Sequence, residues 1–195
     1  MIRDFKFELD RSEVLPQLVG DAKEYLFIGG LGGTARDTTR LTDGGDNLFA
    51  LGGAMGAAAM MGLGLALAQP NRKVLVVTGD GELLMNLGAL ATISVLNPTN
   101  LSIICVDNGH YGETGYQTSH TGRGVDLEEI AKGAGIMNTA TVQSKDQIEN
   151  GAKVVRQDNG TSFVLLRVST KESAPRKRNL DATACRIAFR NALLQ

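Results

Sequence analysis

The sequence has few of the residues on which several common kinds of site depend. It contains no tryptophan, 4 prolines and 2 cysteines among 195 residues. Cys105 and Cys185 lie too far apart for a zinc or redox motif, and Cys105 falls in an apolar run, where we expect a small core residue. The absence of a cysteine cluster disfavours iron–sulfur chemistry in this chain.

An excess of charge of one sign is also absent. The chain has 20 lysines and arginines against 21 aspartates and glutamates, for a net charge of -1. Nucleic acid is therefore not expected as its main partner. The first ten residues lack the apolar stretch of a signal peptide, so a cytoplasmic protein is expected. Residues 48–68 carry no charge, but their many glycines and alanines predict a buried helix rather than a membrane span.

Apolar runs without polar alternation are separated by helical patterns along the chain. Strands are predicted at 25–28, 74–78, 101–107, 139–142 and 163–168. Helices are predicted at 11–20, 51–68, 82–96, 127–134, 144–157 (with a Ser144/Gln147 capping box) and 181–194 (with Asp181 as N-cap). This order predicts an α/β fold with a parallel sheet covered by helices on both faces. We expect one domain over 1–195, with a solvated polar connector and a closing helix at 171–195.

Glycine-rich turns follow three of the predicted strands, after Ile28, Thr78 and Asp107. Glycine allows sharp turns and close approach of the backbone to a ligand. Because ligands of parallel sheets bind at the carboxyl ends of the strands, we expect a site at this edge.

Asp80 lies between two glycines at a strand end, with a predicted helix directly behind it. A carboxylate there can ligate a metal, while the helix N-terminus offers N–H groups to a phosphate. Mg²⁺ prefers oxygen ligands and commonly keeps phosphate in its shell. Asn108 ends the next predicted strand and can supply an amide oxygen, and His110 can supply a backbone carbonyl. One helix and one strand separate Asp80 from Asn108, so the two should end adjacent strands.

The tripeptide at 79–81 (GDG), followed after a helix and a strand by Asn108, resembles the diphosphate-binding motif of thiamine diphosphate enzymes. The run at 51–56 (LGGAMG) is similar to the C-terminal cofactor domain of that family. The segments at 45–52 and 107–115 (DNGHYGETG) are similar to the small β subunits of sulfopyruvate and phosphonopyruvate decarboxylases. Asp107 departs from the usual asparagine, and we expect it to hydrogen-bond a turn.

The resemblance, which covers 25–168, implies a role for each matching residue. Asp80, Asn108 and the His110 carbonyl would hold Mg²⁺. Met55 would keep the thiamine diphosphate bent, and His120, like His110 and Arg36, is a candidate for proton transfer or substrate binding. The cofactor-binding residues would be Gly52, Gly53, Met55, Gly79, Asp80, Gly81, Glu82, Asn108, His110, Tyr111, Gly112, Glu113 and Thr114.

In this family a glutamate that activates the pyrimidine ring comes from a second domain, for which this chain has no room. The resemblance therefore implies a separate pyrimidine-domain (α) subunit, with the site between subunits of a homodimer or a higher hetero-oligomer. The activity implied is decarboxylation of a small 2-oxo acid, with neither nucleic acid nor membrane as a partner. The alternatives are a thiamine diphosphate-dependent carboligase and a non-catalytic subunit.

A dinucleotide-binding oxidoreductase is the remaining hypothesis. Residues 30–35 follow a strand and fit the pattern G-x-G-x-x-A. However, 36–47 are polar and glycine-rich and do not predict a helix, and no acidic residue stands clearly in the required place. The oxidoreductase is therefore the less favoured function.

Overall fold

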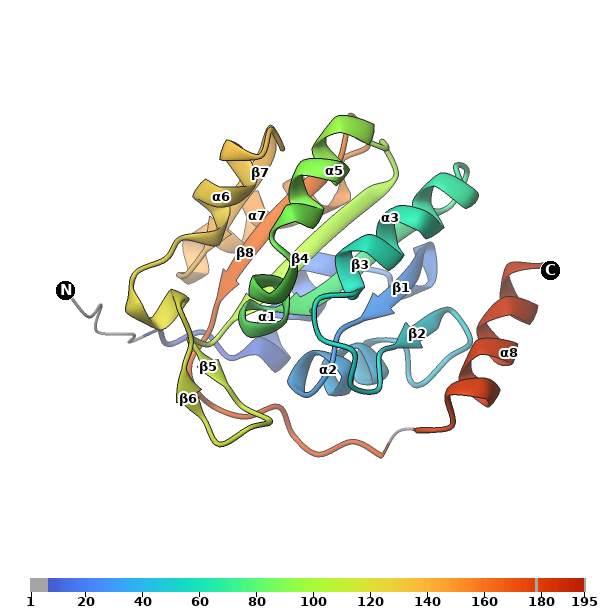
Figure 1. The fold of residues 1–195 in the computed structure, drawn as a ribbon, viewed down its shortest axis with the longest axis horizontal. Helices are drawn as coiled ribbons and strands as arrows, with labels where there is room; N and C mark the ends of the chain where they lie inside the picture. Colours follow the sequence, from blue (N-terminus) through green and yellow to red (C-terminus); the bar gives the residue numbers. More distant parts are fainter. Residues whose placement is uncertain (1–6, 178, 195) are drawn as a thin grey trace.

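The computed structural model describes residues 7–177 and 179–194, and its centre is a six-stranded parallel sheet of order β2-β1-β3-β4-β8-β7 (Figure 1). The strands are β1 Tyr25–Gly29, β2 Leu48–Ala50, β3 Lys73–Gly79, β4 Leu101–Asp107, β7 Asn138–Val142 and β8 Ser162–Arg167. A separate hairpin consists of β5 His110–Tyr111 and β6 Gln117–Thr118. The helices are α1 Arg11–Val19, α2 Gly33–Leu41, α3 Ala58–Ala68, α4 Asp80–Leu83, α5 Gly88–Leu96, α6 Leu127–Gly133, α7 Ile148–Arg156 and α8 Ala182–Leu193.

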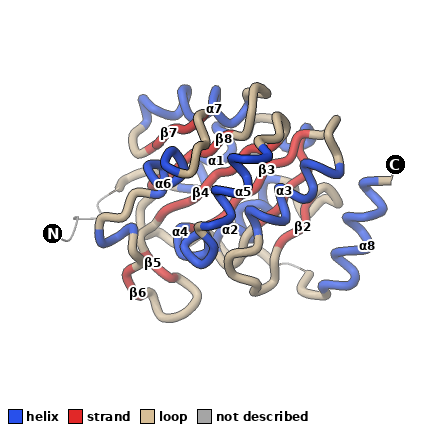
Figure 2. Tube along the Cα trace, turned by 45° about the horizontal axis from the view of Figure 1, so that its top comes forward, coloured by secondary structure: helices blue, strands red, loops and turns tan. Residues whose placement is uncertain are grey.

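Helices cover both faces of the sheet (Figure 2). One core cluster joins alternate strand residues to α3, α5 and α6, and the other joins the remaining ones to α1 and α7. All of β1, β4 and β8 is buried. Because both faces are apolar, these strands have no polar alternation, and the α/β fold predicted from that pattern is confirmed.

The five predicted strands are confirmed as β1, β3, β4, β7 and β8, with ends that differ by at most one residue. The sequence analysis missed β2, a three-residue edge strand that is only partly buried. The turn before β2 is held by Asn47, whose amide donates to the carbonyls of Ala22 and Tyr25. These partners are distant in sequence, so no local pattern indicates the strand.

Two predicted helices differ from the structure. The helix expected at 51–68 begins only at Ala58, because the preceding segment is a glycine-rich loop in which Gly56 has φ +82°. The helix expected at 82–96 begins at Asp80 and is interrupted by a 3₁₀ turn at Leu84–Asn86, which separates α4 from α5.

The expectation that 36–47 contain no helix is wrong, because α2 extends to Leu41. Its buried threonines are satisfied locally: the Thr38 hydroxyl donates to the Thr34 carbonyl at 2.8 Å, and that of Thr39 donates to the Ala35 carbonyl at 2.7 Å. A helix buried through polar groups has no apolar period to detect. Because a helix does follow residues 30–32, its expected absence no longer argues against a dinucleotide fingerprint.

The two predicted caps had different outcomes. Asp181 caps α8 as expected, accepting from the backbone N–H groups of Thr183 and Ala184. The Ser144/Gln147 capping box is wrong, since the Ser144 side chain makes no cap bond and Gln147 instead accepts from the Gln143 N–H. Across the described ranges, no helix combines the length and apolarity that a bilayer crossing needs.

Candidate cofactor site

A cavity of about 410 Å³ lies at the carboxyl ends of β1, β3 and β4. Every residue predicted to bind the cofactor lines it. The other lining residues are Arg11, Leu31, Gly32, Gly33, Thr34, Arg36, Val106, Tyr116, Glu172 and Ser173. The three glycine-rich turns thus meet at one edge of the sheet, as predicted.

Asp80 is the first residue after β3 and begins α4. Its side chain is buried, its Oδ2 accepts from the Ser119 hydroxyl at 2.5 Å, and the Thr121 hydroxyl lies 3.1 Å from the same oxygen. Burial raises the pKa of this carboxyl, and the two hydroxyls oppose that shift. The hydroxyls also fix the direction in which the carboxylate faces.

Asp107 hydrogen-bonds the turn that follows β4, as expected. Its Oδ1 accepts from the Gly109 N–H at 3.0 Å and from the Thr121 hydroxyl at 2.6 Å. Burial, together with the nearby Asp80 carboxylate, raises the pKa of Asp107 to about 7. The Arg167 Nε lies 3.9 Å from Oδ2 and lowers that pKa only in part.

Asn108 and His110 lie beside Asp80 because β3 and β4 are neighbours, with Gly79 opposite Val106. The Asn108 side-chain oxygen accepts from the His110 N–H at 3.1 Å. The His110 ring is 2.8 Å from the Asn108 carbonyl and stacks on Tyr116. The imidazole is therefore held in the turn, which leaves the backbone and the Asn108 amide as the groups suited to a ligand.

His120, the candidate catalytic residue, is not among the residues that line the cavity. It is exposed, and its Nδ1 lies 3.4 Å from the Tyr111 hydroxyl. Among the described residues, its side chain approaches the cavity lining at Tyr111, and the imidazole itself lies outside the cavity.

Three glycines shape the cavity wall. A Cβ at Gly81 would lie 2.6 Å from the Tyr111 ring, so only glycine lets these turns meet. Gly52 and Gly53 have nothing within 4 Å of an added Cβ, which leaves open space beside Met55. The Met55 side chain is partly exposed in the loop before α3 rather than packed in the core.

Glu82 is a second buried carboxylate of the cavity. Within the described ranges, neither of its oxygens makes a well-aligned hydrogen bond. It lies against Gly30, where an added Cβ would be 2.0 Å from Oε2. Burial raises its pKa, and hydrogen bonds from Thr78 and from nearby backbone N–H groups oppose that rise.

The connector packs on α2, and the expectation that it is solvated is wrong at Ser173. This side chain is buried, and its hydroxyl donates to Asp37 Oδ1 at 2.5 Å. Glu172 beside it lines the cavity. Arg178, the last residue of the expected connector, lies outside the described residues. Sequence analysis missed these contacts because they join segments far apart in the chain.

The cavity at the carboxyl edge of the parallel sheet, with a carboxylate and an amide from adjacent strands, defines an α/β domain with a ligand site at this edge. A comparison with known protein families then identifies the family. Residues 31–166 match the model described as "Thiamine pyrophosphate enzyme, C-terminal TPP binding domain", and the chain belongs to this family.

Similar proteins support this assignment. The chain is 40% identical over 144 residues to a sulfopyruvate decarboxylase subunit beta of Methanocaldococcus jannaschii, covering 73% of this chain and 75% of that protein. It is 31% identical to the protein of the same name from Methanococcus maripaludis, covering 95% and 98%. A thiamine diphosphate-dependent 4-hydroxybenzoylformate decarboxylase of Rhodococcus jostii shares the fold, with TM-score 0.64 and 18% identity over 86% of this chain and 34% of that one.

Proposed function

We propose that this chain is the thiamine diphosphate- and Mg²⁺-binding subunit of a 2-oxo acid decarboxylase of the sulfopyruvate or phosphonopyruvate type. The observation that carries the proposal is the meeting of Asp80 and Asn108 in one cavity at adjacent strand ends. The extent of the similarity to two sulfopyruvate decarboxylase β subunits supports the choice of reaction.

The donor set fits Mg²⁺. Asp80 would supply a carboxylate oxygen, Asn108 an amide oxygen and His110 a backbone carbonyl, all hard ligands that leave positions for phosphate oxygens. Ser119 and Thr121 already hold the Asp80 carboxylate in place, which reduces the ordering cost of binding.

Thiamine diphosphate, when bound, supplies the electron sink that decarboxylation of a 2-oxo acid requires. This chain's own residues would position it. The start of α4 at Gly81 and the turn at 111–114 would meet the diphosphate, while Met55 would support the rings and the open space at Gly52 and Gly53 would admit them. The connector at Glu172 and Ser173 would help to exclude water.

We infer that a separate pyrimidine-binding subunit completes the active site. Large apolar side chains are exposed on α3 and the turn that precedes α5: Met60, Met61, Leu67 and Met85. An apolar surface of this kind is typical of a face that a partner covers. The names of both β-subunit relatives also support a hetero-oligomer.

Calorimetry with thiamine diphosphate tests the proposal, on the protein together with any subunit that co-purifies. We expect binding that requires Mg²⁺ and that falls at least about 10-fold in Asp80→Asn, because one charged ligand becomes neutral. Asp146→Asn, which removes an exposed carboxylate, is the matched control. Absence of binding by the wild type, or equal binding by both variants, would contradict the proposed function.

A further inference from the structure

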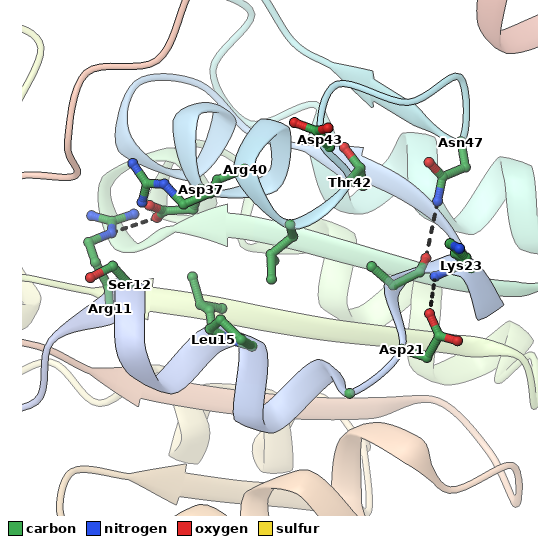
Figure 3. Close-up of a pocket in the computed structure, with 14 residues that line it drawn as sticks. Arg11, Ser12, Leu15, Asp21, Lys23, Asp37, Arg40, Thr42, Asp43 and Asn47 are labelled. Atoms are coloured by element: carbon green, nitrogen blue, oxygen red, sulfur yellow. Dashed lines mark hydrogen bonds and ion pairs between the residues drawn. The ribbon is translucent and has the colours of Figure 1, made fainter.

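Arg11 is a buried cation that makes one side-chain hydrogen bond to the part of the chain that the structure describes. It begins α1, is 7% exposed, and reaches α2, where its Nε donates to Asp37 Oδ2 at 2.6 Å (Figure 3). Its Nη2 is buried and has no partner among residues 7–177 and 179–194. Structural arginine–carboxylate pairs commonly use two parallel bonds, so this one-bond pair leaves the outer edge of the guanidinium available.

The guanidinium lies against the first residue of α2. A Cβ at Gly33 would be 2.8 Å from Arg11 Nη1 and 3.0 Å from Nη2. Gly32, the N-cap, has no side chain to accept from the first-turn N–H groups. The guanidinium and the positive N-terminal end of α2 repel each other. An anion bound between them would be attracted to both.

Asp37 does not provide that anion. It lies one turn into α2, and its two oxygens are occupied by Arg11 and by the Ser173 hydroxyl. Arg36, from the same turn, also has a buried Nε without a partner among the described residues, and its Nη1 lies 3.3 Å from Glu113. Both arginines and Gly32–Thr34 line the cofactor cavity.

We propose that Arg11 and the uncapped start of α2 form a subsite for a tetrahedral oxyanion within the cofactor cavity. The inference rests on the proposed function, which offers two sources of this chemistry: the terminal phosphate of thiamine diphosphate and the sulfonate or phosphonate tail of the substrate. Arg11 also lines a second cavity, of about 430 Å³, between α1 and α2 (Figure 3). The Arg11–Asp37 pair lies at one end of it and forms part of the wall between the two cavities.

The variants must remove the cation without leaving Asp37 buried and unpaired, because that alone can unfold the chain. Arg11→Gln/Asp37→Asn replaces the ion pair by two amides of similar shape. Arg40→Gln is the matched control, since Arg40 lies on α2 and lines the second cavity but not the cofactor cavity. Thermal unfolding and near-UV circular dichroism establish that each variant is folded.

Calorimetry in Mg²⁺ then measures two affinities: that for thiamine diphosphate, against thiamine monophosphate, and that of the loaded protein for a sulfonate-tailed 2-oxo acid, against pyruvate. If the subsite holds the terminal phosphate, the double variant binds thiamine diphosphate about 10- to 100-fold more weakly and thiamine monophosphate unchanged. If it holds the substrate tail, only the sulfonate-tailed acid weakens by that factor.

Affinities in the double variant that match both wild type and Arg40→Gln would overturn the subsite while leaving the proposed function intact. A wild-type protein that does not bind thiamine diphosphate would contradict the proposed function, and the subsite with it. The Asp80→Asn variant distinguishes failure of the subsite from failure of the proposed function. It changes the proposed metal ligand and leaves Arg11 intact.

Discussion

The Thr121 hydroxyl lies between two buried carboxylates. It is 3.1 Å from Asp80 Oδ2 and 2.6 Å from Asp107 Oδ1. A hydroxyl has a single proton to donate, and two negative charges this close repel each other. The raised pKa of Asp107, about 7, reflects burial and this repulsion. Thr121, which no sequence motif singles out, therefore links the two buried carboxylates of the cavity edge.

We expect Thr121→Val to lower the free energy of unfolding by about 1–3 kcal/mol, because it removes a hydroxyl that contacts both buried carboxylates at nearly constant volume. The affinity for thiamine diphosphate with Mg²⁺ should fall as well. Thr92→Val, at an exposed position of α5, is the control. Urea unfolding at neutral pH measures the effect, and equal midpoints for the two variants would show that the Thr121 hydroxyl is dispensable.

At the scale of elements, α3 packs on β3 through Gly62. A Cβ at this position would lie 2.1 Å from the Val76 side chain, while one at Gly64, on the exposed side of the same helix, would meet nothing within 4 Å. The loop that carries Gly52, Gly53 and Met55 leads directly into α3. The contact at Gly62 thus determines how closely α3 packs on the sheet. It thereby also positions the loop that forms one wall of the cavity.

Gly62→Ala should destabilise the protein by about 1–3 kcal/mol, because the helix must move away from the sheet. Gly64→Ala should instead be neutral or stabilising by up to about 1 kcal/mol, since alanine favours a helix over glycine. Thermal unfolding of the pair gives the comparison. A loss of stability at position 64 equal to that at 62 would contradict the packing argument.

At the scale of the whole molecule, the connector joins the carboxyl-terminal segment to the first helices. Lys171 pairs with Asp10 at 2.5 Å, and Arg176 pairs with Asp43 at 2.5 Å. Beyond the connector, α8 lies along the edge strand β2 (Figure 1). The ring centroids of Phe189 and Phe49 are 5.9 Å apart there. Both ion pairs include largely exposed side chains, and each is lost only when acid protonates its carboxylate.

The Lys171 and Ser12 hydrogen bonds lower the pKa of Asp10 from 3.8 to about 2. Its ionised form therefore adds stability that is complete above pH 3.8 and is lost as the pH falls toward 2. Asp10→Asn keeps the N-cap of α1 without the charge, whereas Asp10→Ala loses both and should cost about 1 kcal/mol at neutral pH.

Unfolding free energies measured from pH 7 to 2 test whether the contribution of Asp10 to stability falls in acid. The gap between wild type and Asp10→Asn should be small, because Lys171 is largely exposed and solvent screens the pair. It should close between pH 3.8 and 2, while the gap to Asp10→Ala should narrow but persist. A wild-type advantage over Asp10→Asn that grows in acid would contradict the ion pair.

Local patterns in the sequence determined most of the sheet and the placement of Asp80 and Asn108 at neighbouring strand ends. Buried strands appear as continuous apolar runs. Asp80 and Asn108 follow two such runs that a helical segment connects, so their adjacency follows from the parallel connection. The Asp181 cap is likewise a local bond between a side chain and the backbone two and three residues on. Such features need no information about distant segments.

Only the tertiary structure decided the rest. Asp37 of the polar helix α2, the turn before the edge strand β2, and the buried Ser173 all have partners far away in the chain. Arg11 reaches the cavity, and His120 stays outside it, because of how α1 and the hairpin pack against the sheet edge. A side chain's residue type predicts which bonds it can make, but the packing of distant elements selects its partner.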